Sequence, residues 1–343
     1  MSEKARGYIY DRVEGLTEHS QEIAGAGDNV ANEFDSWSAL KLILHSAAVN
    51  MYTKVISEHK NDFFYIDALA GAGASKYDEN QYFIGSALLA AKAASEPFTK
   101  MYFVEGKKEY KEALESRLDY VFSNPHIDVQ EPQDYEVIHG DANEEIPKIV
   151  DEIWDIATPN PSFNYYCFID NQGLNVSWDT VESLAPTPHG DLLINYPSSQ
   201  AIGRNALRDE KSALNEFFGV ELNNYDIPEE DVREYLKELY TSRLAGLERP
   251  VQESTYVYSG VGSYSYDMIY ATRETEGGSE YIEVIKYVKE FIEAFDGADV
   301  DDMLDIINGD QDTMESYYPE SSDIDDSLPE ESDAGNHSLG DFG

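Results

Sequence analysis

The chain has 343 residues and carries 68 acidic side chains against 24 basic ones, which gives a formal net charge of -44 at pH 7. This length is enough to bury a full core, as one large domain or two small ones. One interpretation is that so acidic a surface repels nucleic acid and anionic membranes. The other is that the protein works in a high-salt cytoplasm, where the repulsion between charges is screened over a Debye length of about 3 Å. We favour the second, halophilic interpretation, under which the charge carries little information about partners.

Apolar periodicity divides the chain into alternating helices and strands. The first 35 residues are polar and punctuated by glycine, and we expect them to be loosely ordered. Helical spacing follows from Trp37 to Tyr52, with Asp35 or Ser36 as the N-cap. Strands are expected at 63–67, 101–105, 135–138, 165–170, 191–196, 254–259 and 265–271. Helices are expected at 85–95, 107–121, 143–153, 177–185, 204–217, 229–243 and 281–295.

This alternation predicts an α/β fold, a doubly wound, mostly parallel sheet with helices on both faces. Only Gly260 to Gly262 separates the last two strands, so they form an antiparallel hairpin. Five parallel strands and this pair predict the seven-stranded Rossmann-type sheet of class I methyltransferases. We place that domain at 36–297, with a helical segment at 204–250. It follows a polar segment at 1–35 and precedes an acidic tail at 298–343, in which we expect a short helix near 299–307 and then disorder.

The most informative stretch follows the first strand of this sheet. Asp67 ends the strand, and Gly71 and Gly73 follow in a turn. Doubly wound sheets bind ligands at the carboxyl ends of their strands, and glycine permits positive φ and close approach of the backbone. Glu105 ends the next strand, where an acid can accept hydrogen bonds from a ribose diol. Together these features favour a nucleoside ligand over a plain tight turn.

The glycine pattern also indicates the kind of nucleoside. Position 76 is Lys, and neither the P-loop pattern nor G-x-G-x-x-G fits. Asp67 would attract the ammonium or sulfonium side of S-adenosylmethionine and would repel a pyrophosphate. We therefore hypothesise that Asp67, Gly71 and Gly73 bind the methionine part of S-adenosylmethionine and that Glu105 binds its ribose.

Acids also end the third and fourth strands. Asp141 could accept from the adenine amino group or cap the helix that begins near Asn143, and the two roles are compatible. The fourth strand opens into Asp170, Asn171 and Gln172. Many amino-group methyltransferases have Asp or Asn, two prolines and an aromatic residue here. Asp170 could orient an acceptor amine, with Gln172 donating or accepting, or it could simply end the strand in an ordinary turn.

Three further residues have two interpretations each. Arg204 could bind a substrate carboxylate or phosphate, or begin a helix at the surface. Trp178 lies close in sequence to the fourth-strand motif, and we include it as a substrate contact. Lys41 is either a solvated lysine or part of a helix that closes over the cofactor.

Cys167 is the only cysteine and lies in an apolar run, so we expect a small buried side chain. A single cysteine excludes an intramolecular disulfide and argues against a cysteine-based zinc site, and we predict no metal. The first residues contain no apolar signal segment, and no apolar run reaches the roughly 18 residues of a membrane span. The sequence therefore predicts a cytoplasmic protein without a membrane partner.

The chain resembles the three-Cys-motif partner proteins, a Rossmann-type, methyltransferase-like family of bacteria and archaea. The order and spacing of the matching pieces are more specific than any one of them. These pieces are Trp37, Lys41-Leu42, Tyr65 to Gly73, Gly85-Ser86-Ala87, Phe103-Val104-Glu105, Gly140 to Asn143, Phe168 to Leu174, Trp178, Asp191 to Pro197 and Arg204. The family's usual Asp-Pro-x-Gly motif has Asn171 in place of its proline here, and this departure bears on methyl transfer more than on ligand binding.

The resemblance implies a cofactor-binding fold that acts with a partner protein carrying three cysteines, in defence or mobile-element systems. Our leading hypothesis is an S-adenosylmethionine-dependent, methyltransferase-like enzyme that acts on a nucleic-acid amine, a substrate chosen by fold analogy alone. The alternative is a non-catalytic interaction protein that keeps the Rossmann fold. A nucleotide-dependent oxidoreductase is a third hypothesis, against which the missing third glycine argues.

Overall fold

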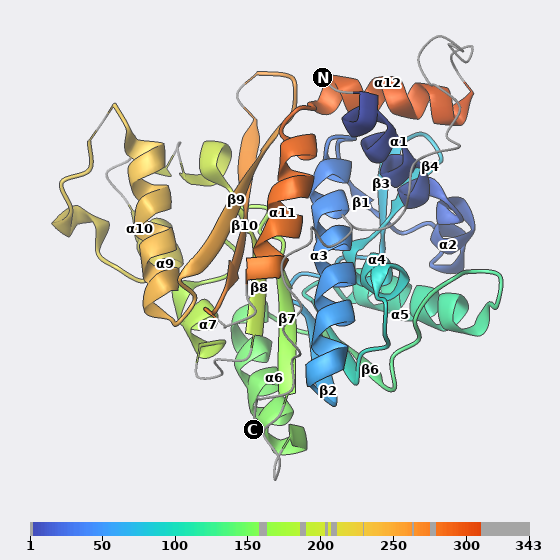
Figure 1. Ribbon diagram of the computed structural model, residues 1–343, viewed down its shortest axis with the longest axis horizontal. Coiled ribbons are helices and arrows are strands. Elements are labelled where there is room, and N and C mark those ends of the chain that lie inside the picture. The colour runs from blue at the N-terminus through green and yellow to red at the C-terminus, as the bar shows by residue number, and fades with distance from the viewer. Residues whose placement is uncertain are drawn as a thin grey trace, which may run out of the picture.

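A computed structural model describes residues 3–157, 163–185, 190–202, 205–206, 211–228, 230–262, 264–274 and 279–309. Its main feature is a seven-stranded sheet (Figure 1). The strands are β2 (Asp62–Asp67), β5 (Lys100–Glu105), β6 (Tyr135–His139), β7 (Phe163–Ile169), β8 (Gly190–Tyr196), β9 (Val251–Tyr258) and β10 (Ser265–Thr272). Their order is β6-β5-β2-β7-β8-β10-β9. The first five strands pair in parallel, and β10 pairs antiparallel with β8 and β9. The predicted parallel sheet and its C-terminal hairpin are confirmed.

Helices cover both faces of this sheet and enclose two hydrophobic cores. One face is covered by α3 (Ser38–His59), α4 (Ser86–Ala93), α5 (Lys108–Ser123) and α11 (Ser279–Ile292). The other face carries α6 (Ala142–Ala157), α7 (Trp178–Ser183), α9 (Ser212–Phe218) and α10 (Val232–Gly246). Alternate residues of one strand enter opposite cores, because successive side chains of a strand point to opposite faces. Tyr65 belongs to the first core and Phe64 to the second.

The central strands are mostly apolar because both of their faces are covered. Every residue of β7 and β8 is buried, so these strands lack the alternation of apolar and polar residues that a half-exposed strand shows, and Asn164, Asp191 and Asn195 are their only strongly polar members. Cys167 lies in β7 and is buried, as expected. None of the described helices is long and apolar enough to cross a membrane.

The N-terminal segment is helical, and the expectation of loose order there is wrong. It forms α1 (Glu3–Thr17) and α2 (Ser20–Ala26). Ile9, Val13 and Leu16 are buried in the first core, because they recur at helical spacing within an otherwise polar segment. The short helix expected near 299–307 is confirmed as α12 (Gly297–Asn308), which packs against α1 (Figure 1). The acidic tail after it lies outside the described residues, as does part of the helix expected at 204–217.

A small second sheet, absent from the sequence prediction, lies between the glycine turn and α4. The hairpin β3 (Ala74–Asp78) and β4 (Gln81–Ile84) is inserted there, and β1 (Asn32–Glu33) pairs in parallel with β3. The N-terminal segment is thereby hydrogen-bonded to the chain that leaves the glycine turn. A separate π-helical turn, Ser198–Ile202, follows β8.

Candidate ligand site at the carboxyl edge of the sheet

The glycine turn has the backbone geometry expected of it, and its surroundings are tightly packed. Gly71 and Gly73 have φ of 64° and 79°, in the left-handed region that favours glycine. A Cβ on Gly71 would lie 2.7 Å from Asn32 Oδ1, and one on Gly73 would lie 2.8 Å from Leu114 Cδ1. Asn32 Oδ1 also accepts from the Ala72 amide at 2.9 Å. The N-terminal segment therefore packs directly on the turn.

Arg117, in α5, contacts the glycine turn, and this contact was not predicted from the sequence. This side chain is fully buried. Its Nε donates to the Ile23 carbonyl at 3.0 Å and its Nη2 to the Ala24 carbonyl at 2.9 Å. Its Nη1 donates to the carbonyl of Ala72, within the glycine turn. Burial lowers the pKa of Arg117 to about 10, so the guanidinium remains charged at neutral pH and links α2 to the turn.

Asp67 lies beneath the turn and is fully buried. Its Oδ2 accepts from Ser86 Oγ at 2.7 Å and from the Tyr65 hydroxyl at 3.2 Å, and its Oδ1 accepts from the Leu69 amide at 3.3 Å. Burial raises the pKa of Asp67 to about 7, although the hydrogen bond from Ser86 opposes this shift. The structure thus places Asp67 among protein donors, and it is absent from the lining of both described cavities.

A chain of hydrogen bonds continues from Asp67 into the first core. The Tyr65 hydroxyl lies 3.2 Å from His45 Nε2, and His45 Nδ1 lies 3.1 Å from the Tyr166 hydroxyl. While Asp67 is ionised the Tyr65 hydroxyl donates to it, and the contact with His45 then suits a neutral imidazole that carries its proton on Nε2 and accepts from Tyr166 on Nδ1. Burial lowers the pKa of His45 to about 3, which keeps the ring neutral.

Asp170 ends β7 and is held on both carboxylate oxygens. Lys41 Nζ donates to its Oδ2 at 2.6 Å, and Asn195 Nδ2 donates to its Oδ1 at 2.9 Å. The Lys41 and Asp170 side chains are 5% and 12% exposed. Lys41 is therefore a buried partner of Asp170, and the interpretation of it as a solvated lysine is wrong. The sequence signal for this was a lysine with apolar neighbours on both sides, Leu40 and Leu42.

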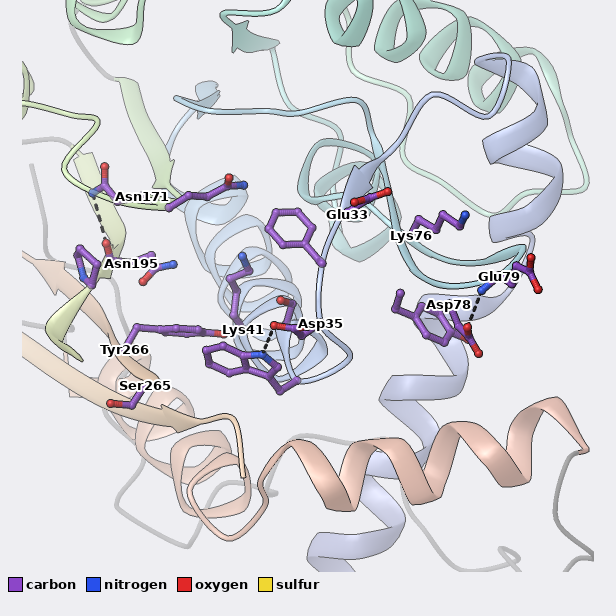
Figure 2. Close-up of a pocket in the computed structure, with 16 residues that line it drawn as sticks. Glu33, Asp35, Lys41, Lys76, Asp78, Glu79, Asn171, Asn195, Ser265 and Tyr266 are labelled. Carbon is purple, nitrogen blue, oxygen red and sulfur yellow. Dashed lines mark hydrogen bonds between the residues drawn. The ribbon is translucent and has the colours of Figure 1, made fainter. Parts of the chain in front are cut away.

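A cavity of about 670 Å³ opens beside this ion pair. Its lining comes from the ends of the sheet strands, from the N-terminal segment with the start of α3, and from the β3–β4 hairpin. The lining residues are Glu33, Phe34, Asp35, Trp37, Ser38, Lys41, Lys76, Tyr77, Asp78, Glu79, Asn171, Gln172, Asn195, Pro197, Ser265 and Tyr266. Figure 2 shows Asn171, Asn195 and Tyr266 on one side of Lys41, and Lys76, Asp78 and Glu79 on the other. Gln172, predicted to be catalytic, lies on this wall.

A second, much smaller cavity of about 30 Å³ lies at the glycine turn itself. Gly71, Gly73 and Asp170 are among its lining residues. Ligand pockets for small molecules span roughly 300–1,000 Å³. The methionine part of S-adenosylmethionine therefore does not fit at the turn in this conformation. Asn32 and Phe34, from the N-terminal segment, also line that space.

The residues expected to bind the nucleoside part lie at adjacent strand ends. Glu105 is 9% exposed and its Oε1 accepts from the Lys107 amide at 2.7 Å. Its carbonyl accepts from the Gly140 amide at 3.1 Å, which places Asp141 at the neighbouring strand end. Asp141 is exposed, and its Oδ1 accepts from the Asn143 amide at 2.8 Å, as a helix cap does. The two acids thus lie at adjacent strand ends, and neither of them lines the two cavities described above.

Of the two predicted substrate contacts, Trp178 is not brought to the cavity. Trp178 is 2% exposed and packs in the second core, with the Arg243 guanidinium 4.3 Å from its ring centroid. A Cβ on Gly219 would lie 2.4 Å from Trp178 Cδ1, so the indole is enclosed by the chain. Arg204 lies outside the described residues. Among the residues described, no group of three or more His, Cys, Asp or Glu side chains is placed to hold a metal ion.

No protein-family model matches this chain. No curated protein matches it either. Solved structures do resemble it in part, and three of them are described here. A Legionella pneumophila protein of the family model DUF519 is 10% identical, with a TM-score of 0.42, over 73% of this chain and 91% of that one. Trm1 from Pyrococcus horikoshii, in complex with S-adenosyl-L-methionine, is 11% identical, with a TM-score of 0.40, over 73% of this chain and 59% of that one.

Human methyltransferase-like protein 13, in complex with SAH, is 12% identical, with a TM-score of 0.35, over 74% of this chain and 91% of that one. Similarities of this size carry no argument about activity. What the molecule itself shows is a mixed α/β protein with a large, mostly parallel seven-stranded sheet and candidate ligand residues at the carboxyl ends of its strands.

Proposed function

We propose that this protein is a class I methyltransferase-like protein that binds S-adenosylmethionine. The observation that carries the proposal is the strand order. Numbered in chain order within the large sheet, the strands lie 3-2-1-4-5-7-6, with only the seventh antiparallel, which is the arrangement of class I methyltransferases. The glycine turn follows the first strand and Glu105 ends the second, where ligands of doubly wound sheets bind.

In this proposal Glu105 binds the ribose hydroxyls, and Asp141 accepts from the adenine amino group. Gly71 and Gly73 allow the backbone to approach the methionine part. When bound, the cofactor supplies an activated methyl group. Room for it requires the small cavity at the turn to widen, and Asn32 and Phe34 are the residues of the N-terminal segment that line this cavity.

The Glu105→Ala variant should lose at least about tenfold in affinity for S-adenosylmethionine, since a hydrogen bond to a charged group contributes about 1.5–3 kcal/mol. Calorimetric titration in molar KCl measures it. Glu109→Ala is the matched control, because it removes one exposed carboxylate from the first turn of α5 and leaves the end of β5 intact. Equal affinities for all three proteins, or no binding by the folded wild-type protein, would refute the proposal.

A second candidate function is a non-catalytic interaction protein that keeps the fold. The observation in its favour is that both carboxylate oxygens of Asp170 are already bound, by Lys41 and Asn195. With one donor on each oxygen and a side chain that is only 12% exposed, Asp170 offers an acceptor amine little access. In both candidate functions we propose that the chain acts with a partner protein that carries three cysteines, and this part of the proposal rests on the family resemblance alone. Transfer of radioactive methyl groups to extracted nucleic acid or protein, with and without that partner, distinguishes an enzyme from an interaction protein.

A further inference from the structure

The large cavity has an excess of negative charge. Its lining includes four carboxylates, Glu33, Asp35, Asp78 and Glu79, and two lysines, Lys41 and Lys76. Lys41 is ion-paired with Asp170 at 2.6 Å, so that pair is neutral as a unit. The remaining charges favour a cation and repel the phosphates of a nucleic acid.

Two buried polar atoms on the same lining have no hydrogen-bond partner. They are Asn195 Oδ1 and the Tyr266 hydroxyl, in side chains that are 5% and 8% exposed. Unpaired buried polar atoms are costly and rare, so each calls for an explanation. An amide oxygen can only accept, and the hydroxyl can accept as well. Each atom has almost no accessible surface of its own, so a donor in the cavity would satisfy both atoms once the two side chains turn toward it.

The aromatic part of the lining suits the same ligand. The rings of Trp37 and Tyr266 pack with their centroids 4.9 Å apart. Lys41 Nζ lies 4.7 Å from the centroid of Phe34, so this wall already has an ammonium group over an aromatic face. Asp170 binds that same ammonium. The chain's own lysine thus shows how carboxylate and ring together accommodate such a group.

We propose that this cavity binds an aliphatic ammonium group, which donates to Asn195 Oδ1 and to the Tyr266 hydroxyl. The group belongs either to a free polyamine or to a lysine side chain of a peptide, and the chemistry is the same for both. The inference concerns binding alone, and it holds whether or not a methyl group is transferred. It differs from the nucleic-acid amine suggested by fold analogy, because the acidic lining opposes a polyphosphate.

The sharpest variant is Tyr266→Phe. It removes a hydroxyl that has no partner in the protein, so it should leave the melting temperature unchanged or raise it. Tyr196→Phe is the matched control, because the Tyr196 hydroxyl is also buried and unpaired but packs in the second core, outside the cavity lining. Calorimetric titrations use spermidine, a capped peptide of alternating glycine and lysine, and a single-stranded DNA dodecamer. Molar KCl limits attraction to the acidic surface to about 3 Å.

We expect spermidine or the lysine peptide to bind the wild-type and Tyr196→Phe proteins, and Tyr266→Phe to weaken that binding about tenfold. Binding of spermidine alone identifies a free polyamine, and binding of the peptide identifies a protein ligand. Equal binding by all three proteins would locate the amine on the outer surface and overturn the inference. Binding of the DNA alone, or of none of the three probes, would overturn it too. Titration of the same samples with S-adenosylmethionine tests the proposed function separately, since either can fail without the other.

Discussion

Between about pH 4 and pH 7, the free energy of unfolding of an Asp67→Asn variant should rise relative to that of the wild-type protein, by up to about 4 kcal/mol. Asp67 is fully buried, and burial raises its pKa from 3.8 to about 7. In this range the carboxyl is ionised in the unfolded chain and protonated in the folded one. The folded wild-type protein then holds the extra proton on Asp67, so the contribution of this residue to stability falls as the pH rises. The amide of the variant does not titrate.

His45 has the opposite effect in the same range. Burial lowers its pKa from 6.5 to about 3, so the unfolded chain binds the extra proton and stability rises with pH up to about 6.5. In the wild-type protein the contributions of Asp67 and His45 to the pH dependence of stability largely cancel between about pH 4 and 6.5. Neither contribution is therefore visible in the wild-type protein alone. The difference between the wild type and Asp67→Asn isolates the carboxyl.

Urea unfolding at a series of pH values measures this difference. Below about pH 4 the offset between the two proteins should be constant, because Asp67 is then protonated in both the folded and unfolded states. A difference in the free energy of unfolding that stays constant up to pH 7 and above would contradict this prediction. It would mean that the pKa of Asp67 is not shifted and that the carboxyl is not buried in the folded protein.

Replacing Arg117 with leucine should lower the free energy of unfolding by about 3–5 kcal/mol. The guanidinium donates to the carbonyls of Ile23, Ala24 and Ala72, and all three lose a donor in the buried interior. Arg117→Lys should fall in between, because an ammonium keeps the charge but cannot reproduce the planar fork of donors.

Urea denaturation at pH 7 checks this order. Arg233→Leu, on the exposed surface of α10, is the control and should change the free energy of unfolding by about 0.5 kcal/mol or less. A loss in Arg117→Leu no larger than in Arg233→Leu would show that the three carbonyls find other donors, and that α2 is not held to the glycine turn in this way.

The sheet could be predicted because strands that are buried on both faces appear in the sequence as short, mostly apolar runs. The strand expected at 165–170 is β7 at Phe163–Ile169, and the one expected at 191–196 is β8 at Gly190–Tyr196. The β3–β4 hairpin could not be predicted in the same way, since it is half-exposed and contains Lys76, Asp78 and Glu79. Its one local signal is Asn80, which adopts a φ of 61° at the tip.

In the candidate site, too, some features could be predicted from the sequence and others could not. The position of an acid at a strand end follows from a general rule, so Glu105 and Asp170 could be placed at the sheet edge from sequence alone. Which side chain faces such an acid depends on tertiary packing. Lys41 and Asp170 are 129 residues apart in the chain, and nothing local to either indicates the other. The same holds for Arg117, whose helix has the pattern of an ordinary surface helix.

The walls of the large cavity lie mostly outside the seven-stranded sheet. Ten of its sixteen lining residues come from the N-terminal segment, the start of α3 and the inserted hairpin. They are Lys41 and the lining residues within 33–38 and 76–79. Loops and insertions tolerate changes in length and sequence far better than buried strands do. Ligand preference can therefore diverge among descendants of this fold while the core stays constant, so overall sequence similarity would be a poor guide to what each of them binds.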